Sequence, residues 1–249
     1  MNVICDIDGV VYRGERLIPG SDLALRRLRD AGATVHFATN NSTKSTLTVS
    51  EKLTRITGVD FDPGSIVTSS QAAVHLLGPD PGLVMVLGSE GIVSALADAG
   101  IEMTDDPLDA KALLVGLDFD LSYDRLSRAA DAVRYGARFI ATNTDPTYPV
   151  AEGLLPGGGA MVAAVQVTTG VVPEVAGKPH APMRALLRAK GIEEAWVIGD
   201  RVDTDIALAR AETDWTSILV LTGVTGPDDT GEADHVVPDL AAAVDLMLA

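Results

Sequence analysis

Short runs of apolar and β-branched residues alternate with amphipathic segments along almost the whole chain. This alternation is typical of βαβ units, in which helices cover the faces of a parallel sheet. The apolar runs predict strands at Asn2–Asp6, Thr34–Thr39, Ser65–Thr68, Leu83–Gly88, Ala112–Gly116, Arg138–Thr142, Ala195–Gly199, Ser217–Thr222 and His235–Val237. The amphipathic segments predict helices at Ser21–Ala31, Thr43–Thr57, Ser70–Leu77, Glu90–Ala99, Tyr123–Tyr135, Gly159–Thr169, Ala181–Lys190, Asp203–Ala211 and Leu240–Leu248. The pattern therefore predicts an α/β fold with a parallel sheet.

Two turn-rich patches interrupt the alternation. They are Gly78-Pro79-Asp80-Pro81-Gly82 and Gly177-Lys178-Pro179, where glycine and proline favour turns. Domain boundaries fall in segments of this kind, and 249 residues are enough for two small domains. We therefore predict a domain boundary at each patch.

Polar side chains gather next to the predicted strand ends. In chain order they are Asp6, Asp8, Thr39-Asn40-Asn41-Ser42, Asp200, Asp203 and Asp205, and Lys178 joins them from a position just before a later helix. Ligands of open parallel sheets bind at the carboxyl ends of the strands, so these groups are expected to converge on one edge.

Such a cluster has a specific chemical use. Several carboxylates close together repel one another unless a cation joins them, and oxygen-rich sites suit Mg²⁺. Lys178 and a helix N-terminus presenting free N–H groups at Asn40–Thr43 would hold a phosphate. One aspartate would then be free to attack phosphorus, while a second moves protons.

The net charge narrows the class of partner. It is −16, from 35 acidic and 19 basic residues, so the basic surface that nucleic acid needs is missing and a nucleic-acid partner is not expected. An acidic surface also repels anionic substrates at long range. Any phosphate site must therefore carry its own lysine or metal.

Other features of the sequence exclude further classes. No apolar run approaches the roughly 18 to 20 residues of a membrane span, and no basic segment precedes an apolar core at the N-terminus. We therefore expect no membrane partner and a cytoplasmic location. The single cysteine, Cys5, is expected as a buried thiol, and the four histidines form no zinc-binding pair.

Six stretches together carry a family resemblance. "DIDGVVYRG" at 6–14, "ATNNS" at 38–42, "GKP" at 177–179 and "GDRVDTDI" at 199–206 resemble the four ordered motifs of the haloacid dehalogenase (HAD) superfamily of phosphohydrolases. "ATNTDPTYPVAEGLLPGGGAMVAAV" at 141–165 and "ILVLTGVT" at 218–225 resemble its NagD-like class IIA branch. That branch includes p-nitrophenyl phosphatases and phosphatases of nucleotides, sugar phosphates and glycerol phosphate.

The resemblance implies a role for each motif residue. Asp6 matches the nucleophile that becomes aspartyl-phosphate, and Asp8 matches the general acid and base, whose backbone carbonyl also binds Mg²⁺. Asp200 matches the third metal ligand and Asp205 an outer-shell acid, whereas Asp203 is expected to face solvent. Phosphate-binding roles fall to Thr39, Asn40, Asn41 and Lys178.

The resemblance also implies a Rossmann-like HAD core at 1–77 and 177–249, with an inserted α/β cap at 78–176. The cap would close over the site, choose the leaving group and offer a surface for pairing two copies of the chain. Asn143, Asp145 and the turn Pro156-Gly157-Gly158-Gly159 are then candidate substrate contacts. Because the glycines lack the GK[ST] ending of a P-loop, close helix packing is the expected reason for them.

These residues predict a Mg²⁺-dependent phosphatase of small phosphomonoesters, acting through an aspartyl-phosphate on Asp6. A phosphomutase or phosphotransferase using the same site is an alternative, and so is a non-catalytic sensor of phosphorylated metabolites. A dehalogenase is disfavoured, because it needs no metal and Asp8, Asp200 and Asp205 would then repel one another without compensation.

Overall fold

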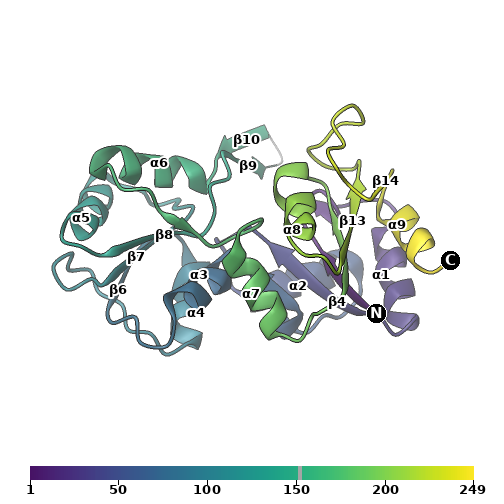
Figure 1. The fold of residues 1–249 in the computed structure, drawn as a ribbon, viewed down its shortest axis with the longest axis horizontal. Coiled ribbons are helices and arrows are strands. Elements are labelled where there is room, and N and C mark those ends of the chain that lie inside the picture. The colour runs from purple at the N-terminus through teal and green to yellow at the C-terminus, as the bar shows by residue number, and fades with distance from the viewer. Residues whose placement is uncertain (151–152) are drawn as a thin grey trace.

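A parallel sheet of six strands forms one lobe of the protein (Figure 1). The computed structural model describes residues 1–150 and 153–249. In spatial order the strands are β14 (His235–Val237), β13 (Trp215–Val220), β12 (Ala195–Gly199), β1 (Asn2–Cys5), β4 (Thr34–Thr39) and β5 (Ile66–Thr68). Since β1 pairs in parallel with both β12 and β4, the carboxyl ends of these three strands lie side by side.

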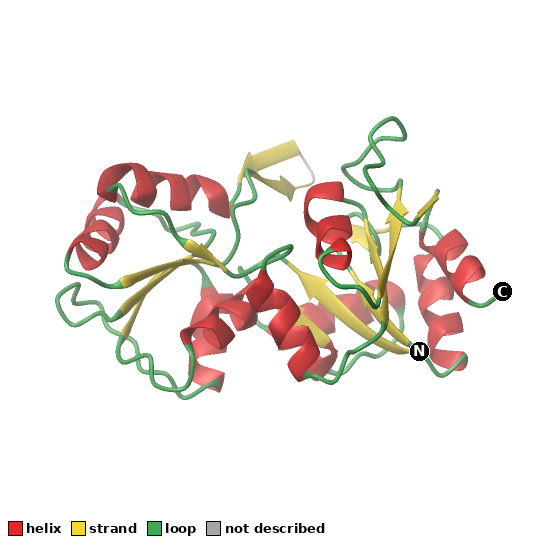
Figure 2. Ribbon diagram, viewed as in Figure 1, coloured by secondary structure: helices red, strands yellow, loops and turns green. Residues whose placement is uncertain are grey.

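Both faces of this sheet are covered by helices (Figure 2). Val3 and Cys5 of β1 join an apolar cluster with α1 (Ser21–Asp30), α2 (Thr46–Thr57) and α9 (Leu240–Met247). Ile4 joins a second cluster with α3 (Ser69–Leu77), α7 (Ala181–Ala189) and α8 (Ala207–Arg210). Successive strand residues point to opposite faces, so a strand between two helical layers reads as a continuous apolar run. A 3₁₀ turn at Pro63–Ser65 precedes β5.

A second parallel sheet forms the other lobe. Its order is β11 (Glu174–Val175), β8 (Arg138–Ala141), β7 (Ala112–Val115) and β6 (Val84–Leu87). Helices α5 (Tyr123–Arg134) and α6 (Gly158–Thr169) pack on one face, and α4 (Glu90–Asp98) packs on the other, in the apolar cluster that also contains α3. All four strands lie within the range expected for an inserted cap, whose bounds stay a prediction. Both termini lie in the six-stranded lobe (Figure 1).

The predicted α/β fold with a parallel sheet is confirmed, but two hairpins were not predicted. They are β2 (Tyr12–Arg13) with β3 (Arg16–Leu17), and β9 (Thr147–Val150) with β10 (Gly153–Pro156). The second lies within the 141–165 motif, of which residues 151–152 fall outside the described part. Its strands are largely exposed and β9 contains Pro149. The sequence therefore shows neither a buried apolar run nor a clear alternation of apolar and polar residues that would predict these strands. Among the described residues, no helix has the length and apolarity needed to cross a membrane.

The helix expected at Thr43–Thr57 starts later than predicted. Helix α2 begins at Thr46, because the Ser45 hydroxyl accepts the N–H of Thr48 and caps the first turn. Before it, the Asn41 side chain accepts the N–H of Thr43 at 2.9 Å and bends the chain into a turn. The prediction of a helix N-terminus at Asn40–Thr43 is therefore wrong, since these residues form a loop.

Candidate active site

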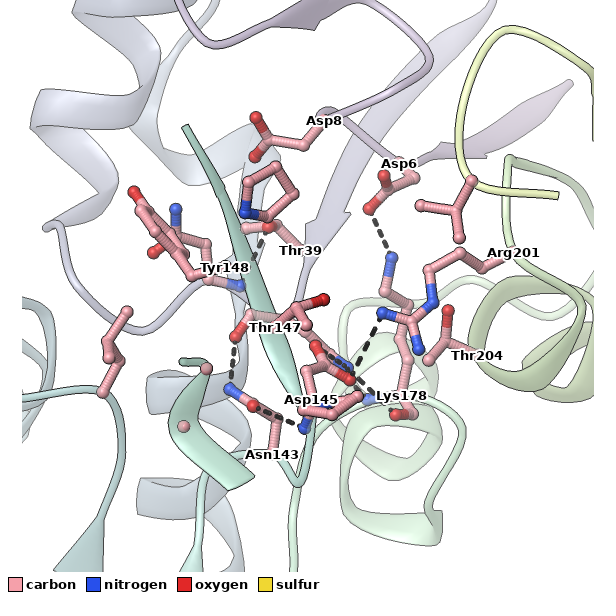
Figure 3. A pocket seen from close by; sticks show the side chains of 18 of the residues that line it. Asp6, Asp8, Thr39, Asn143, Asp145, Thr147, Tyr148, Lys178, Arg201 and Thr204 are labelled. Carbon is pink, nitrogen blue, oxygen red and sulfur yellow. Dashed lines mark hydrogen bonds and ion pairs between the residues drawn. The ribbon is translucent and has the colours of Figure 1, made fainter. Parts of the chain in front are cut away.

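A cavity of about 270 Å³ lies between the carboxyl ends of β1, β4 and β12 and the segment that follows β8. Its lining includes ten of the residues named as candidates from the sequence, which are Asp6, Asp8, Thr39, Asn40, Asn41, Asn143, Asp145, Lys178, Asp200 and Asp205. Of the candidate turn, Gly157 and Gly158 line the cavity, whereas Pro156 and Gly159 do not. Figure 3 shows many of these side chains. Asp203 is not among them, since its side chain is 69% exposed and pairs with Arg201 instead. The fold thus brings together residues from both ends and the middle of the chain.

Three aspartates form the centre of the site. Asp6, Asp200 and Asp205 each place a carboxylate oxygen within 4.8 Å of the others. Asp6 directly follows β1 and Asp200 directly follows β12, so the pairing of these strands sets the two acids side by side. The triad fits a divalent cation, because it offers several hard oxygen ligands that otherwise repel one another.

The Asp200 carboxylate is held in place by the loops around it. One of its oxygens accepts the N–H of Val224 at 2.7 Å. Gly9, at φ 88°, lies so close that a Cβ there would come within 2.6 Å of the same oxygen. A side chain at position 9 would therefore displace the carboxylate, which explains the glycine that follows Asp8.

A π-helical turn orients the Asp205 side chain toward the site. Residues Val202–Ile206 form a π-helical turn before α8, where one helix was expected throughout. The carbonyl of Arg201 accepts the N–H groups of both Asp205 and Ile206, which widens the turn. The Asp205 carboxylate then accepts the N–H of Arg201 at 3.2 Å. Asp205 thus points back toward Asp200 from the start of the helix.

Lys178 neutralises part of this negative charge. Its Nζ lies 2.5 Å from Asp6 Oδ1 and 2.6 Å from Asp205 Oδ1, and it donates a third hydrogen bond to the Ala38 carbonyl at 2.7 Å. Burial acts to lower the pKa of Lys178, but Asp205 and Asp6 outweigh burial and raise it. All three donors of the ammonium group are used, so the lysine stays charged and fixed.

Burial raises the pKa of both Asp6 and Asp200. Desolvation is the largest cause for Asp6, whose pKa is raised well above its ordinary value despite the opposing charge of Lys178. For Asp200, desolvation and the charge of Asp205 raise the pKa to about 6. One lysine therefore does not fully compensate the charge of three carboxylates, and a further positive charge would stabilise the site.

Asp8 occupies a different environment from Asp6. Its carboxylate lies apart from the triad, on the side of the cavity near Tyr148 (Figure 3). Burial is the main cause that raises the pKa of Asp8, and Lys52 and Lys178 partly oppose it. A carboxyl group with a raised pKa holds a proton more readily at neutral pH, as a proton donor requires.

Two family models match the parts of the chain that carry these residues. A model described as haloacid dehalogenase-like hydrolase matches residues 3–102, which include Asp6 and Asp8. A model described as HAD-hydrolase-like matches residues 175–243, which include Lys178, Asp200 and Asp205. The chain belongs to the haloacid dehalogenase-like hydrolases.

Its relatives are phosphatases. A D-glycerol 3-phosphate phosphatase from Mycobacterium tuberculosis is 37% identical over 242 residues, which are 94% of this chain and 66% of that protein. An acid sugar phosphatase from Staphylococcus epidermidis is 36% identical over 231 residues, which are 91% of this chain and 88% of that protein. The crystal structure of a glycerol phosphate phosphatase from M. tuberculosis in complex with magnesium matches with a TM-score of 0.89 and 35% identity, covering 96% of this chain and 74% of that one.

The names of the relatives test the predicted NagD-like branch and the predicted enzyme class. Further matched structures carry the names p-nitrophenyl phosphatase and nagD protein. The predicted membership of the NagD-like branch and the class of phosphoric monoester hydrolase are thus confirmed. The first of these relatives is longer, since this hydrolase spans 66% of its length.

In this hydrolase, Asn40 links the two lobes. Its Oδ1 accepts the backbone N–H of Lys178 at 2.7 Å, and its Nδ2 donates to the Lys178 carbonyl at 3.1 Å and to Asp145 at 3.2 Å. Asn143 in turn donates to the Asn40 carbonyl at 2.7 Å and accepts the N–H of Asp145 at 3.1 Å. Asn143 and Asp145 thus hold the segment after β8 against the loop after β4, while their role as substrate contacts stays a prediction.

The other loop residues also have partners within the protein. The Thr39 hydroxyl accepts the N–H of Asn41 at 3.0 Å, which leaves its own proton free to be donated into the cavity. Gly157 and Gly158 line the cavity too. A Cβ at Gly158 would lie 3.0 Å from Asn143 Oδ1, and one at Gly159 would come within 2.5 Å of the Thr144 carbonyl. Close packing therefore accounts for the glycines.

Several lining residues were missed from the sequence. Arg201 and Thr204 lie within the "GDRVDTDI" motif, yet only the aspartates of that motif were given roles. Arg201 reaches across to Asp145 at 3.7 Å. The hairpin residues Thr147, Tyr148 and Leu154 lie within the 141–165 motif and were missed because the hairpin itself was. In both cases, the position of the residue within a family motif could have identified it as a residue of the site.

Proposed function

We propose that this chain is a Mg²⁺-dependent phosphatase that hydrolyses small phosphomonoesters through an aspartyl-phosphate on Asp6. The observation that carries the proposal is the fixed contact of Lys178 with Asp6 and Asp205, next to Asp200 and at the bottom of a 270 Å³ cavity. Phosphatase names among the relatives and the magnesium in one related structure support it.

Asp6, Asp200 and Asp205 are the side chains proposed to hold the Mg²⁺, with Asp205 acting from the outer shell and the Asp8 carbonyl as a further ligand. When bound, the ion would balance the charge of the carboxylates and of the phosphoryl oxygens. The proposal follows from the donor set, because three carboxylates, of which those of Asp200 and Asp205 are buried, share one lysine and suit a small divalent cation.

The chemistry is assigned to two aspartates in two steps. In the first, an oxygen of Asp6 bonds to phosphorus, the bond to the leaving oxygen breaks, and Asp8 gives that oxygen a proton. In the second, Asp8 takes a proton from water, the water oxygen bonds to phosphorus, and the bond to Asp6 breaks to release phosphate. Lys178 and the Thr39 hydroxyl stabilise the negative charge on the transferred group.

A phosphate-release screen tests this function. Glycerol, sugar, nucleotide and p-nitrophenyl phosphates are offered with Mg²⁺ in excess, and again after a chelator in excess has removed the Mg²⁺ by mass action. We expect turnover of several esters with Mg²⁺ and a loss with the chelator. Isomerisation of a hexose phosphate without release of phosphate would point to a mutase instead. A stable phosphoaspartate without turnover would point to a sensor.

A further inference from the structure

The cavity has two chemically different walls (Figure 3). The wall formed by the six-stranded lobe carries the acid triad, Asp8 and Lys178. A second wall comes from the β9–β10 hairpin and its neighbours, and the residues used below are Leu117, Pro146, Thr147, Tyr148, Pro149 and Leu154. Apart from Asp145, the described residues of this wall bear no charge. A leaving group that extends away from the triad would therefore meet aliphatic, proline and aromatic surface.

The positive charges of the cavity are already in use. Among its described lining residues, five aspartates face two cations, Lys178 and Arg201. Lys178 binds Asp6 and Asp205. Arg201 makes a two-pronged contact with Asp203, through Nε at 2.9 Å and Nη2 at 2.6 Å, and its Nη1 lies 3.7 Å from Asp145. Among the described lining residues, a second anionic group on a substrate would find no cation without an acidic partner, and it would lie near Asp8 or Asp145.

Tyr148 is the aromatic element of the uncharged wall. Its ring packs edge-on against Phe119, with ring centroids 5.8 Å apart at 74°. An edge-on pair of this kind stabilises the position of the ring and leaves apolar surface for contact. The wall is thus suited to contact with carbon-bound hydrogens or an aromatic leaving group.

We propose that this wall makes the enzyme selective for phosphate esters whose leaving group is uncharged, such as a polyol or a phenol, and against esters that carry a second carboxylate or phosphate. The inference rests on the proposed function and narrows its substrate class. An anion that loses its water without gaining a partner is disfavoured, and the nearby aspartates add repulsion.

A matched pair of substrates tests the proposal. Racemic glycerol 3-phosphate and racemic 3-phosphoglycerate differ at one group. The first carries an uncharged hydroxymethyl group where the second carries a carboxylate. We expect kcat/KM for the glycerol ester to exceed that for the glycerate ester by about tenfold or more, because like charges at close range reject a ligand strongly. Equal values, or a preference for the glycerate ester, would overturn the proposal. If no ester is turned over, p-nitrophenyl phosphate included, the proposed phosphatase function itself would be contradicted.

A charge placed on the wall gives a second test. Leu154 lines the cavity, whereas its neighbour Leu155 does not, as expected for successive strand residues. We expect Leu154→Lys to raise the ratio of kcat/KM for 3-phosphoglycerate over glycerol 3-phosphate by about tenfold, since a cation there would pair with the carboxylate. Leu155→Lys adds the same charge outside the cavity and should leave the ratio unchanged. An unchanged ratio in Leu154→Lys, or an equal rise in both variants, would contradict the assignment of this wall.

Discussion

The ammonium group of Lys178 lies 2.5 Å from a carboxylate oxygen of Asp6, although 172 positions separate the two residues. Asp6 ends the central strand, and Lys178 stands at the return of the chain from the second lobe to the first. The contact therefore ties the strand that carries the proposed nucleophile to one of the two junctions between the lobes.

Loss of Lys178 should affect stability as well as activity. In Lys178→Met, the buried Asp6 and Asp205 lose their common partner, and we expect the free energy of unfolding at pH 7.5 to fall by roughly 3–5 kcal/mol. The loss should shrink at pH 5, because Asp6, whose pKa is raised by burial, then takes up a proton more readily. Urea unfolding of the parent and of Lys178→Met at both pH values measures this difference in the free energy of unfolding. Lys190→Met, which alters an exposed lysine, should change stability by no more than about 0.5 kcal/mol. A Lys178→Met protein as stable as the parent at pH 7.5 would refute a structural role for the ion pair.

Asp6→Asn should remove turnover while the protein stays folded. The amide keeps the shape of the carboxylate but is a poor nucleophile, so we expect kcat for p-nitrophenyl phosphate to fall by about a thousandfold or more. Circular dichroism checks the fold. Asp203→Asn is the matched control, because Asp203 belongs to the same charged region but points to solvent, and it should keep most of the activity. Turnover by Asp6→Asn at the parent's rate would rule out the aspartyl-phosphate.

The metal-free protein should lose stability as pH rises through the range in which Asp200 titrates. The pKa of Asp200 is raised from 3.8 to about 6, so between these values the folded state binds a proton that the unfolded state has released. Stability from this group is complete below pH 3.8 and is lost as pH rises through about 6. In chelator, the stability of the parent relative to Asp200→Asn should therefore decline from pH 4 to pH 7.

Addition of Mg²⁺ completes that test. A ligand that binds only the folded state raises the melting temperature, and the carboxylates must be ionised to bind it. We expect a rise in melting temperature that is larger at pH 7.5 than at pH 5 and smaller in Asp200→Asn at both. A stabilisation by Mg²⁺ that is the same in parent and variant would place the ion elsewhere.

Gly9→Ala should weaken metal binding by displacing Asp200. Position 9 has φ 88° and would set a Cβ 2.6 Å from Asp200 Oδ2. We expect the dissociation constant for Mg²⁺ to rise by about tenfold, as for other changes that disturb the support of a ligand. Calorimetric titration measures it. Gly14→Ala shares the left-handed backbone, with φ 56°, but has open space around its Cβ. Both variants should lose stability, and an equal effect of both on Mg²⁺ affinity would show that backbone strain alone is responsible.

The chemistry of the site could be predicted largely from local sequence. A parallel sheet gathers its strand ends on one edge, so Asp6, Asp8 and Asp200 were expected to meet there because each follows an apolar run. The motif context then separated Asp205 from Asp203, and the structure agrees, since the first is buried and the second is exposed.

Other features depend on contacts that local pattern does not encode. The start of α2 shifted to Thr46 because side chains within the loop, those of Asn41 and Ser45, satisfied backbone groups that a helix would otherwise use. The β9–β10 hairpin was not predicted, because its strands are short and largely exposed and Pro149 interrupts β9.

The sequence by itself determined the α/β class, the family and the kinds of group at the site, because hydrophobic periodicity and residues at strand ends are local properties of the chain. Only the tertiary structure decided that Asn40 bonds to Lys178 and Asp145, and that the described hairpin residues lining the cavity of the acid triad bear no charge. The contacts of Asn40 join residues more than a hundred positions apart. Their geometry is set by the packing of two lobes, which no single segment specifies.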